Sequence, residues 1–251
     1  TFSFCSPVLL VNFWETATQL SAFNETLVDE LNSKKILLIG AGGLAHPLVT
    51  SLCGSGLTTF DIADGDVIEY KNLHRQFLFN EKCIGQGKAR VLKSELEDHY
   101  PQTNISIIEK FLEEKDLFEQ IPNYDLIIDC SDNFKTRYNI NEVCVEKNIP
   151  LVMGLASGVT GHAAAFLNYA NSPCYECIFP RNTNINEDSC DEVGILTPVL
   201  SYVSSIVAMM TIRIILDQFT KENFLYRIDG MTLKTNQTLI NKDKECFVCK
   251  K

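Results

Sequence analysis

The sequence predicts an α/β fold in which a doubly wound, mostly parallel sheet carries helices on both faces. Two observations predict it. Short apolar runs alternate with stretches of helical character up to about residue 160. The first run ends in a glycine-rich turn that is typical of Rossmann-like nucleotide-binding folds. With 251 residues, the chain is long enough for one large domain with a sizeable core.

The expected elements follow in chain order. Buried parallel strands are typical of short apolar runs, here residues 34–40, 57–64, 105–111, 124–133 and 150–157, with a further strand at 161–170. Helices are expected at 21–34, after the glycine turn at 40–45, from about Lys88 to residue 100, and at 113–121, 134–148 and 197–219. Near the end of the chain, Asp229-Gly230 predicts a hairpin turn.

The overall charge excludes two classes of partner. Lys and Arg number 22 and Asp and Glu 32, which gives a net charge of −10. An acidic surface disfavours nucleic acids and anionic membranes, so neither is expected as a partner. The apolar run at 197–219 is long enough to cross a membrane, but it contains several hydroxyl groups and Arg213, which favours a buried core helix. The first residues carry no basic secretory leader, so we expect a cytoplasmic protein with reduced thiols.

Four of the ten cysteines form two CxxC pairs, Cys174 with Cys177 and Cys246 with Cys249. In a reducing compartment, two such pairs predict four thiolates around one Zn²⁺. The 68 residues between the pairs exceed the spacing of a zinc finger, so the metal would join distant segments of the chain. The alternative is two unrelated buried pairs. A redox motif is disfavoured because neither pair follows a strand into a helix.

A nucleotide site is predicted at the glycine turn "GAGGLA". Gly40 and Gly42, with Gly43 beside them, match the spacing that lets a backbone approach phosphates at a helix N-terminus. Asp64 follows Gly40 by 24 residues and ends the next strand, where a carboxylate is placed for ribose hydroxyls. An NAD-dependent dehydrogenase would carry the same two features.

The next segment favours a triphosphate over a dinucleotide. Residues 71–93 carry a net charge of +5, and cations of this kind neutralise a triphosphate during phosphoryl or nucleotidyl transfer. Arg75 and Lys88 are the candidates for phosphate contact, and a solvated helix face accounts for the other cations. Asp132 follows the carboxyl end of a strand and could hold Mg²⁺, whereas Asp129 inside the strand is expected to be structural.

Taken in order, these motifs resemble the ThiF/MoeB/HesA adenylyltransferases, which are relatives of the ubiquitin-activating enzymes. The resemblance covers roughly residues 28–249 and rests on "GAGGLA", "DIADGDVIEYKNLHRQFLF", "GQGKA", "DCSDN", the two CxxC pairs and Cys190 in "DSCDEVGILTP". It implies ATP- and Mg²⁺-dependent adenylation of the C-terminal glycine of a small ubiquitin-fold sulfur-carrier protein ending in Gly-Gly. Such carriers serve thiamine or molybdopterin biosynthesis, and "CIFPRN" is slightly more similar to the thiamine-pathway members.

The resemblance also implies roles for individual residues. They are Gly43 on ATP, Asp64 on its ribose, Asn72 and Arg75 on the phosphates, Lys88 on the α-phosphate, Asp132 on Mg²⁺, and Cys174, Cys177, Cys246 and Cys249 on Zn²⁺. These residues fit the adenylation reaction, because the nucleophile is the C-terminal carboxylate of the carrier, which is already ionised and needs no general base. Placement at the α-phosphorus and stabilisation of the departing pyrophosphate suffice.

The resemblance divides the chain into an N-terminal extension, residues 1–27, and a single adenylation domain, residues 28–251. Within that domain we expect a nucleotide-binding part at 28–160 and a carrier-binding and zinc part at 161–251. In the family, a cysteine at the position of Cys190 can join covalently to the carrier or to a sulfur donor. Four flanking acids should raise the pKa of Cys190, so a catalytic thiol and a free thiol both stay open.

The sequence departs from the family at two places. His46 and Pro47 replace small residues after the glycine turn, and we expect His46 to be an exposed helix residue. Many members also carry an N-terminal arginine that reaches the ATP of the partner subunit, but the corresponding "ETATQLSAF" has none. A homodimer is nevertheless expected from the family, and the sulfur is expected from a separate donor protein. The alternatives are a divergent relative that binds or adenylates another peptide or protein C-terminus and, more remotely, an NAD(P)-dependent oxidoreductase.

Overall fold

The structure is a computed structural model that describes Trp14 and residues 26–181, 194–219 and 223–250. Its strands are β1 (Ile36–Ile39), β2 (Thr59–Ala63), β3 (Asn104–Ile108), β4 (Leu126–Asp129), β5 (Leu151–Ser157), β6 (Thr160–Phe166), β7 (Phe224–Asp229) and β8 (Lys234–Leu239). Its helices are α2 (Leu27–Leu31), α3 (Ala45–Gly54), α4 (Lys88–His99), α5 (Glu114–Gln120), α6 (Phe134–Lys147) and α8 (Thr197–Ile215). Short 3₁₀ turns lie at η1 (Tyr70–Asn72), η2 (Glu81–Cys83), η3 (Ile121–Asn123) and η4 (Tyr175–Cys177).

All eight strands form one sheet in the order β3-β2-β1-β4-β5-β6-β7-β8. The strands from β3 to β5 are parallel, and β6, β7 and β8 continue the sheet in antiparallel fashion. The predicted mostly parallel α/β sheet is therefore confirmed. Because β1 lies between β2 and β4, the chain leaves it in both directions, and the crevice at the carboxyl ends of such strands is where open α/β sheets bind ligands.

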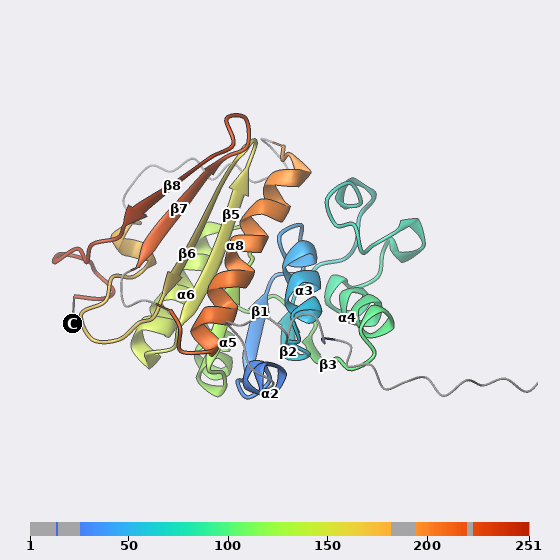
Figure 1. Cartoon of the computed structure of the whole chain (residues 1–251), viewed down its shortest axis with the longest axis horizontal. Coiled ribbons are helices and arrows are strands. Elements are labelled where there is room, and N and C mark those ends of the chain that lie inside the picture. Colours follow the sequence, from blue (N-terminus) through green and yellow to red (C-terminus); the bar gives the residue numbers. More distant parts are fainter. Residues whose placement is uncertain (1–13, 15–25, 182–193, 220–222, 251) are drawn as a thin grey trace, which may run out of the picture.

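Helices cover both faces of the sheet (Figure 1). Helices α3, α4 and α8 share one hydrophobic core with β1, β2 and β4, and α5 and α6 share a second core on the opposite face. The central strands β1 and β4 are buried along their whole length, as their continuous apolar sequences require. The two cores make the parallel half of the sheet a rigid base from which the connecting loops project.

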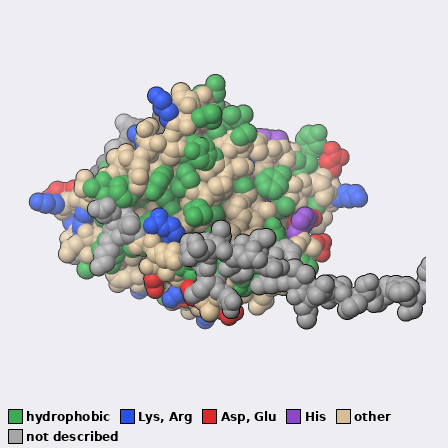
Figure 2. Space-filling view, in the orientation of Figure 1, with side chains coloured by type: hydrophobic (Ala, Val, Ile, Leu, Met, Phe, Trp, Pro, Cys, Tyr) green, Lys and Arg blue, Asp and Glu red, His purple; other side chains and the backbone are tan. Residues whose placement is uncertain are grey.

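Helix α8 is the one helix among the described residues that is long and apolar enough to span a membrane. Its apolar window is 56% buried inside the molecule, where the helix packs against α3, β5 and β6. Its outer face carries the exposed side chains of Tyr202 and Met209, and Figure 2 shows hydrophobic side chains spread over the upper part of this side of the molecule. The packing agrees with the core helix expected from the sequence.

Two elements differ in length from the prediction. Helix α8 ends at Ile215 and not at residue 219, because Asp217 adopts a left-handed conformation (φ 52°) and the N–H of Gln218 donates to the carbonyl of Arg213 at 2.8 Å. The hairpin predicted at Asp229-Gly230 is present between β7 and β8, but four residues connect its strands. The Asp229 carboxylate accepts hydrogen bonds from two N–H groups of this loop, which fixes its shape.

Candidate functional site

A cavity of about 510 Å³ opens at the carboxyl ends of the parallel strands. All eight residues predicted to contact the nucleotide or its magnesium line this cavity. They are Gly40, Gly42, Gly43, Asp64, Asn72, Arg75, Lys88 and Asp132. These residues are separated by up to 92 positions in the sequence, and the order of the strands brings them to one place. The volume lies in the range of small-molecule and cofactor sites.

The glycine turn is shaped by two close approaches. Gly40 has a φ of 98°, and a Cβ added there would lie 2.7 Å from the carbonyl oxygen of Cys130, so only glycine fits. A Cβ at Gly43 would lie 2.9 Å from Leu200 of α8. A Cβ added at Gly42 would make only an ordinary van der Waals contact, 3.9 Å from the side-chain nitrogen of Gln76. The turn leads directly into α3, whose N-terminus provides backbone N–H groups and a partial positive charge for an anion.

Asp64, which directly follows β2, forms a hydrogen bond with the backbone of the glycine turn. One carboxylate oxygen accepts a hydrogen bond from the N–H of Ala41 at 2.6 Å, and the other accepts one from the N–H of Asp66 at 2.7 Å. Burial raises the pKa of the Asp64 carboxyl, and these two hydrogen bonds oppose that rise. The carboxylate is thus held rigidly at the cavity wall, with oxygens oriented as acceptors.

Two cations and an amide also line the cavity, next to the glycine turn and Asp64. Lys88, the first residue of α4, is almost buried and forms an ion pair with Asp66, whose carboxylate is partly exposed. The Arg75 guanidinium donates to the carbonyl of Lys71 at 3.2 Å, which directs the side chain along the segment after η1. Asn72 accepts a hydrogen bond from the N–H of Glu69 at 3.0 Å through its side-chain oxygen, so its amide NH₂ group is the part available to the cavity. Donors and positive charge therefore converge there.

The segment after β4 carries Asp132 into the cavity. Buried Asp129 accepts two hydrogen bonds from Ser131, at 2.8 Å from its N–H and 2.6 Å from its hydroxyl, and lies 3.4 Å from the guanidinium of buried Arg137. Arg137 also donates to the carbonyl of Ser131. Asp129 is thus bound within the protein and does not line the cavity, and its expected structural role stays a prediction. Within the described residues, the exposed Asp132 carboxylate makes no hydrogen bond and faces the cavity.

His46 is fully buried, so its predicted exposure is wrong. Its Nδ1 accepts a hydrogen bond from the N–H of Leu78 at 3.1 Å, and its ring contacts Phe79 edge-on, with centroids 4.4 Å apart. The chain between η1 and η2 folds back over the start of α3 and covers the ring, a long-range contact that helix position alone does not predict. Desolvation lowers the pKa of His46 to about 3, so the imidazole is neutral at physiological pH.

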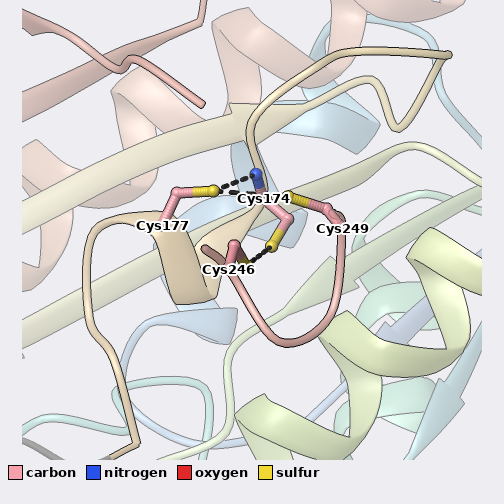
Figure 3. Close-up of side chains that lie close together, drawn as sticks. All are labelled: Cys174, Cys177, Cys246 and Cys249. Atoms are coloured by element: carbon pink, nitrogen blue, oxygen red, sulfur yellow. Dashed lines mark hydrogen bonds between the residues drawn. The ribbon is translucent and has the colours of Figure 1, made fainter. Parts of the chain in front are cut away.

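The four cysteines of the CxxC pairs form a second site away from the cavity (Figure 3). Their sulfur atoms all lie within 4.8 Å of one another, and the side chains point toward a common centre from η4 and from the segment near the C-terminal end. Such a set of thiols, mostly buried, fits one tetrahedral Zn²⁺. The N–H groups of Cys174 and Asp243 donate to the sulfur of Cys177 at 3.5 and 3.4 Å, which stabilises negative charge on that sulfur.

Helix α6 lies beside the cysteine cluster and forms hydrogen bonds with it. The buried side chain of Asn141 accepts a hydrogen bond from the N–H of Tyr175 at 2.9 Å and donates to the sulfur of Cys174 at 3.7 Å. Arg181 pairs with buried Glu176 at 3.0 Å and with Glu142 of α6 at 2.7 Å. These contacts tie the first CxxC pair to the same helix whose N-terminal end adjoins the cavity.

The sequence did not single out several residues that line the cavity. Asp66 holds Lys88, and Arg137 holds the segment of Asp132. Phe111 and Leu112 add an apolar surface after β3, and an aromatic ring is a surface on which a base can stack. His162 of β6 also lines the cavity. Its signal in the sequence was a polar ring within the otherwise apolar strand "GHAAAF".

Two expectations concern residues outside the described part of the chain. Cys190, the candidate covalent thiol, lies in 182–193, and the N-terminal stretch without an arginine lies in 15–23. Both stay predictions. The expected division of the domain at residue 160 also stays a prediction, and the sheet itself runs without interruption from β5 to β6 across that position.

The sheet, the glycine turn and the cysteine cluster define a Rossmann-like α/β fold with a candidate nucleotide site and a candidate zinc site. The chain belongs to the ThiF family, whose sequence pattern matches residues 15–248. It is 38% identical over 187 residues to "Adenylyltransferase and sulfurtransferase UBA4" of Meyerozyma guilliermondii. This alignment covers 74% of this chain and 44% of that protein. It is 33% identical over 186 residues to the "Probable molybdopterin-synthase adenylyltransferase" of Gracilaria tenuistipitata var. liui, which covers 74% of this chain and 52% of that protein.

Solved structures agree with this assignment. The crystal structure of E. coli MccB with succinimide superimposes with a TM-score of 0.76 at 25% sequence identity, over 90% of this chain and 69% of MccB. The chain spans about half the length of the curated relatives that it matches.

Proposed function

We propose that this chain catalyses ATP-dependent adenylation of the C-terminal glycine of a small ubiquitin-fold sulfur-carrier protein. The observation that carries the proposal is the single cavity in which the glycine turn, Asp64, the two cations and Asp132 converge. The names of the relatives, which are adenylyltransferases, support it. The predicted contacts with ATP are part of this proposal.

The residues divide the work of nucleotide binding. The N-terminus of α3 and the turn at Gly42 receive phosphate oxygens, and Asp64 accepts hydrogen bonds from the ribose hydroxyls. Lys88 is held by Asp66 in a partly buried ion pair, and an incoming α-phosphate can replace that carboxylate as its anionic partner. Arg75 and the amide of Asn72 then contact the remaining phosphates, where negative charge develops on the departing pyrophosphate.

Two metal ions are part of the proposal. Asp132 fits a divalent cation, because its carboxylate faces the cavity and carboxylate oxygens are the ligands that Mg²⁺ prefers. When bound, Mg²⁺ would neutralise phosphate charge. The four clustered cysteines would hold a structural Zn²⁺, which leaves no open position for chemistry. A cytoplasmic location, which we also propose, would keep these thiols reduced as zinc binding requires.

ATP–pyrophosphate exchange tests the proposal. We expect exchange that depends on a carrier ending in Gly-Gly, and the molybdopterin-pathway carrier comes first because of the name of the Gracilaria relative. The thiamine-pathway carrier comes second. Lys88→Ala should lower the exchange rate about 10²- to 10³-fold, since it removes a charged donor at the α-phosphate. Lys82→Ala is the matched control, because Lys82 lies in the same basic segment but does not line the cavity.

If neither carrier supports ATP–pyrophosphate exchange by the wild-type chain, adenylation of these sulfur carriers is contradicted. The second candidate is a divergent family member that binds or adenylates another peptide or protein C-terminus, because no motif in the sequence encodes the carboxylate acceptor. Exchange with a peptide substrate in the absence of both carriers would support it. The expected homodimer and the separate sulfur donor are further proposals, and the oligomeric state is measured by light scattering on the same preparation.

A further inference from the structure

His162 is a polar side chain in the cavity that the contacts proposed for ATP do not use. It lies in the middle of β6, paired in register with Leu155 of β5 and Arg227 of β7. Its ring packs edge-on against Phe179, with centroids 6.3 Å apart and planes at 80°. The packing fixes one edge of the ring, while the residue contributes to the lining of the cavity.

The imidazole is available for a ligand. It is half-buried, and no hydrogen bond joins its ring nitrogens to any residue in the described part of the chain. Burial and the positive charge of Arg227 lower the pKa of His162. The neutral ring that results offers one N–H donor and one nitrogen acceptor. The ring nitrogens are not among the buried polar atoms without a partner, so they remain accessible to a ligand that enters the cavity.

The position of His162 in the cavity indicates which substrate it contacts. The glycine turn, Asp64 and the cations of the 71–93 segment make up the nucleotide wall, and they come from the parallel half of the sheet. A separate wall comes from β5 and β6, where the sheet changes from parallel to antiparallel, and contains Leu155, Ser157, Thr160 and His162. A second substrate that reacts at the α-phosphorus must enter along the wall that the nucleotide leaves free.

We propose that His162 hydrogen-bonds the backbone of the extended C-terminal segment of the carboxylate substrate and thereby determines acceptance of that substrate. An extended peptide presents alternating N–H and C=O groups, and a neutral imidazole can pair with either kind. Being uncharged, it does not draw the terminal carboxylate away from the α-phosphorus. The inference rests on the proposed adenylation and adds a residue that distinguishes the peptide from ATP.

The test compares three variants in carrier-dependent ATP–pyrophosphate exchange on the full chain. His162→Leu removes both hydrogen-bonding groups and keeps an apolar side chain beside Leu155 and Phe179. His162→Gln keeps a neutral donor and acceptor. His99→Leu is the matched control, because His99 is exposed on α4 and does not line the cavity. The probe is the carrier, molybdopterin-pathway or thiamine-pathway, that supports exchange in the wild type.

We expect His162→Leu to raise the KM for the carrier about tenfold, which is the effect of losing a neutral hydrogen bond, with the KM for ATP unchanged. His162→Gln should restore the carrier KM to within about threefold of the wild type, and His99→Leu should match the wild type. The inference is overturned if His162→Leu leaves the carrier KM unchanged, or if it raises both KM values equally and glutamine does not restore them. If the wild type exchanges with neither carrier, the proposed function itself fails.

Discussion

A neutral imidazole enclosed by protein, His46, makes the stability of this chain depend on pH. The folded pKa is about 3 and the unfolded value is about 6.5. Between these values the unfolded chain binds a proton that the folded chain does not. Stability from this residue is therefore complete above about pH 6.5 and is lost as the pH falls toward 3. The expected loss between pH 7 and pH 5 is about 2 kcal/mol.

Urea unfolding of wild type and His46→Asn measures this effect. Asparagine places a side-chain oxygen near the position of Nδ1, where it can accept from the N–H of Leu78, but it does not titrate. We expect the variant to lose about 2 kcal/mol less than the wild type between pH 7 and pH 5. His99→Asn, at an exposed position, should show the wild-type pH dependence. A parallel decline in wild type and His46→Asn would contradict the burial of a neutral His46.

Whether a residue could be placed from the sequence depends on whether a local motif or a tertiary contact sets its environment. Gly40 and Asp64 could be placed at the cavity from the sequence, because the strand–turn–helix pattern fixes their positions relative to the edge of the sheet. The environment of His46 could not, because the segment that covers it begins about thirty positions later. His162 was not singled out from the sequence, because its direction depends on the register of β6 with β5 and β7, which hydrophobic patterning does not specify.

Among the elements, the cysteine cluster joins η4 to the segment that follows β8 (Figure 3). A bound metal at this place closes a long stretch of chain, so its free energy of binding also stabilises the fold. We expect about one Zn²⁺ per chain by elemental analysis. Cys174→Ser should lose the metal and expose residues 240–250 to hydrogen exchange, because the C-terminal CxxC pair is then no longer anchored.

Cys190→Ser is the matched control, because Cys190 lies outside the two CxxC pairs in the sequence. That variant should retain the metal and the protection of the C-terminal segment. Wild-type protein that is folded but free of zinc would refute the four-cysteine site. Retention of zinc by Cys174→Ser would show that other ligands hold it.

The ends of elements were harder to predict than their presence. The alternation of apolar runs gave the parallel strands, because both faces of each are covered by helices. The end of α8 depends on the left-handed conformation of Asp217, which aspartate adopts more often than most non-glycine residues but which its presence in the sequence does not dictate. The loop after Asp229 depends on hydrogen bonds to its carboxylate, which lengthen the connection beyond a two-residue turn. Both ends are set by local backbone conformations, which hydrophobic periodicity does not predict.

For the whole molecule, the distribution of charge matters more than its sum. The chain carries −10 overall, yet the cavity gathers Arg75, Lys88 and the N-terminus of α3. These groups come from separate connections within one sheet, so the site is complete only when the sheet is folded. Ligand binding should therefore stabilise the entire fold and not one loop, which makes global unfolding a measure of what the cavity binds.

Thermal unfolding with different nucleotides separates an adenylating enzyme from a dehydrogenase. At a concentration of ATP–Mg²⁺ about 100-fold above its Kd, binding should add about 2.7 kcal/mol to the free energy of unfolding. For a domain of this size, that corresponds to a rise in Tm of roughly 5–10 °C. Asp132→Asn should reduce the part of this rise that depends on Mg²⁺, while its ligand-free Tm stays near the wild-type value because Asp132 is exposed. A rise with NAD⁺ and none with ATP would instead favour a nicotinamide-dependent oxidoreductase, since a dinucleotide would use the same glycine turn and Asp64 but has no need of the cations at Arg75 and Lys88.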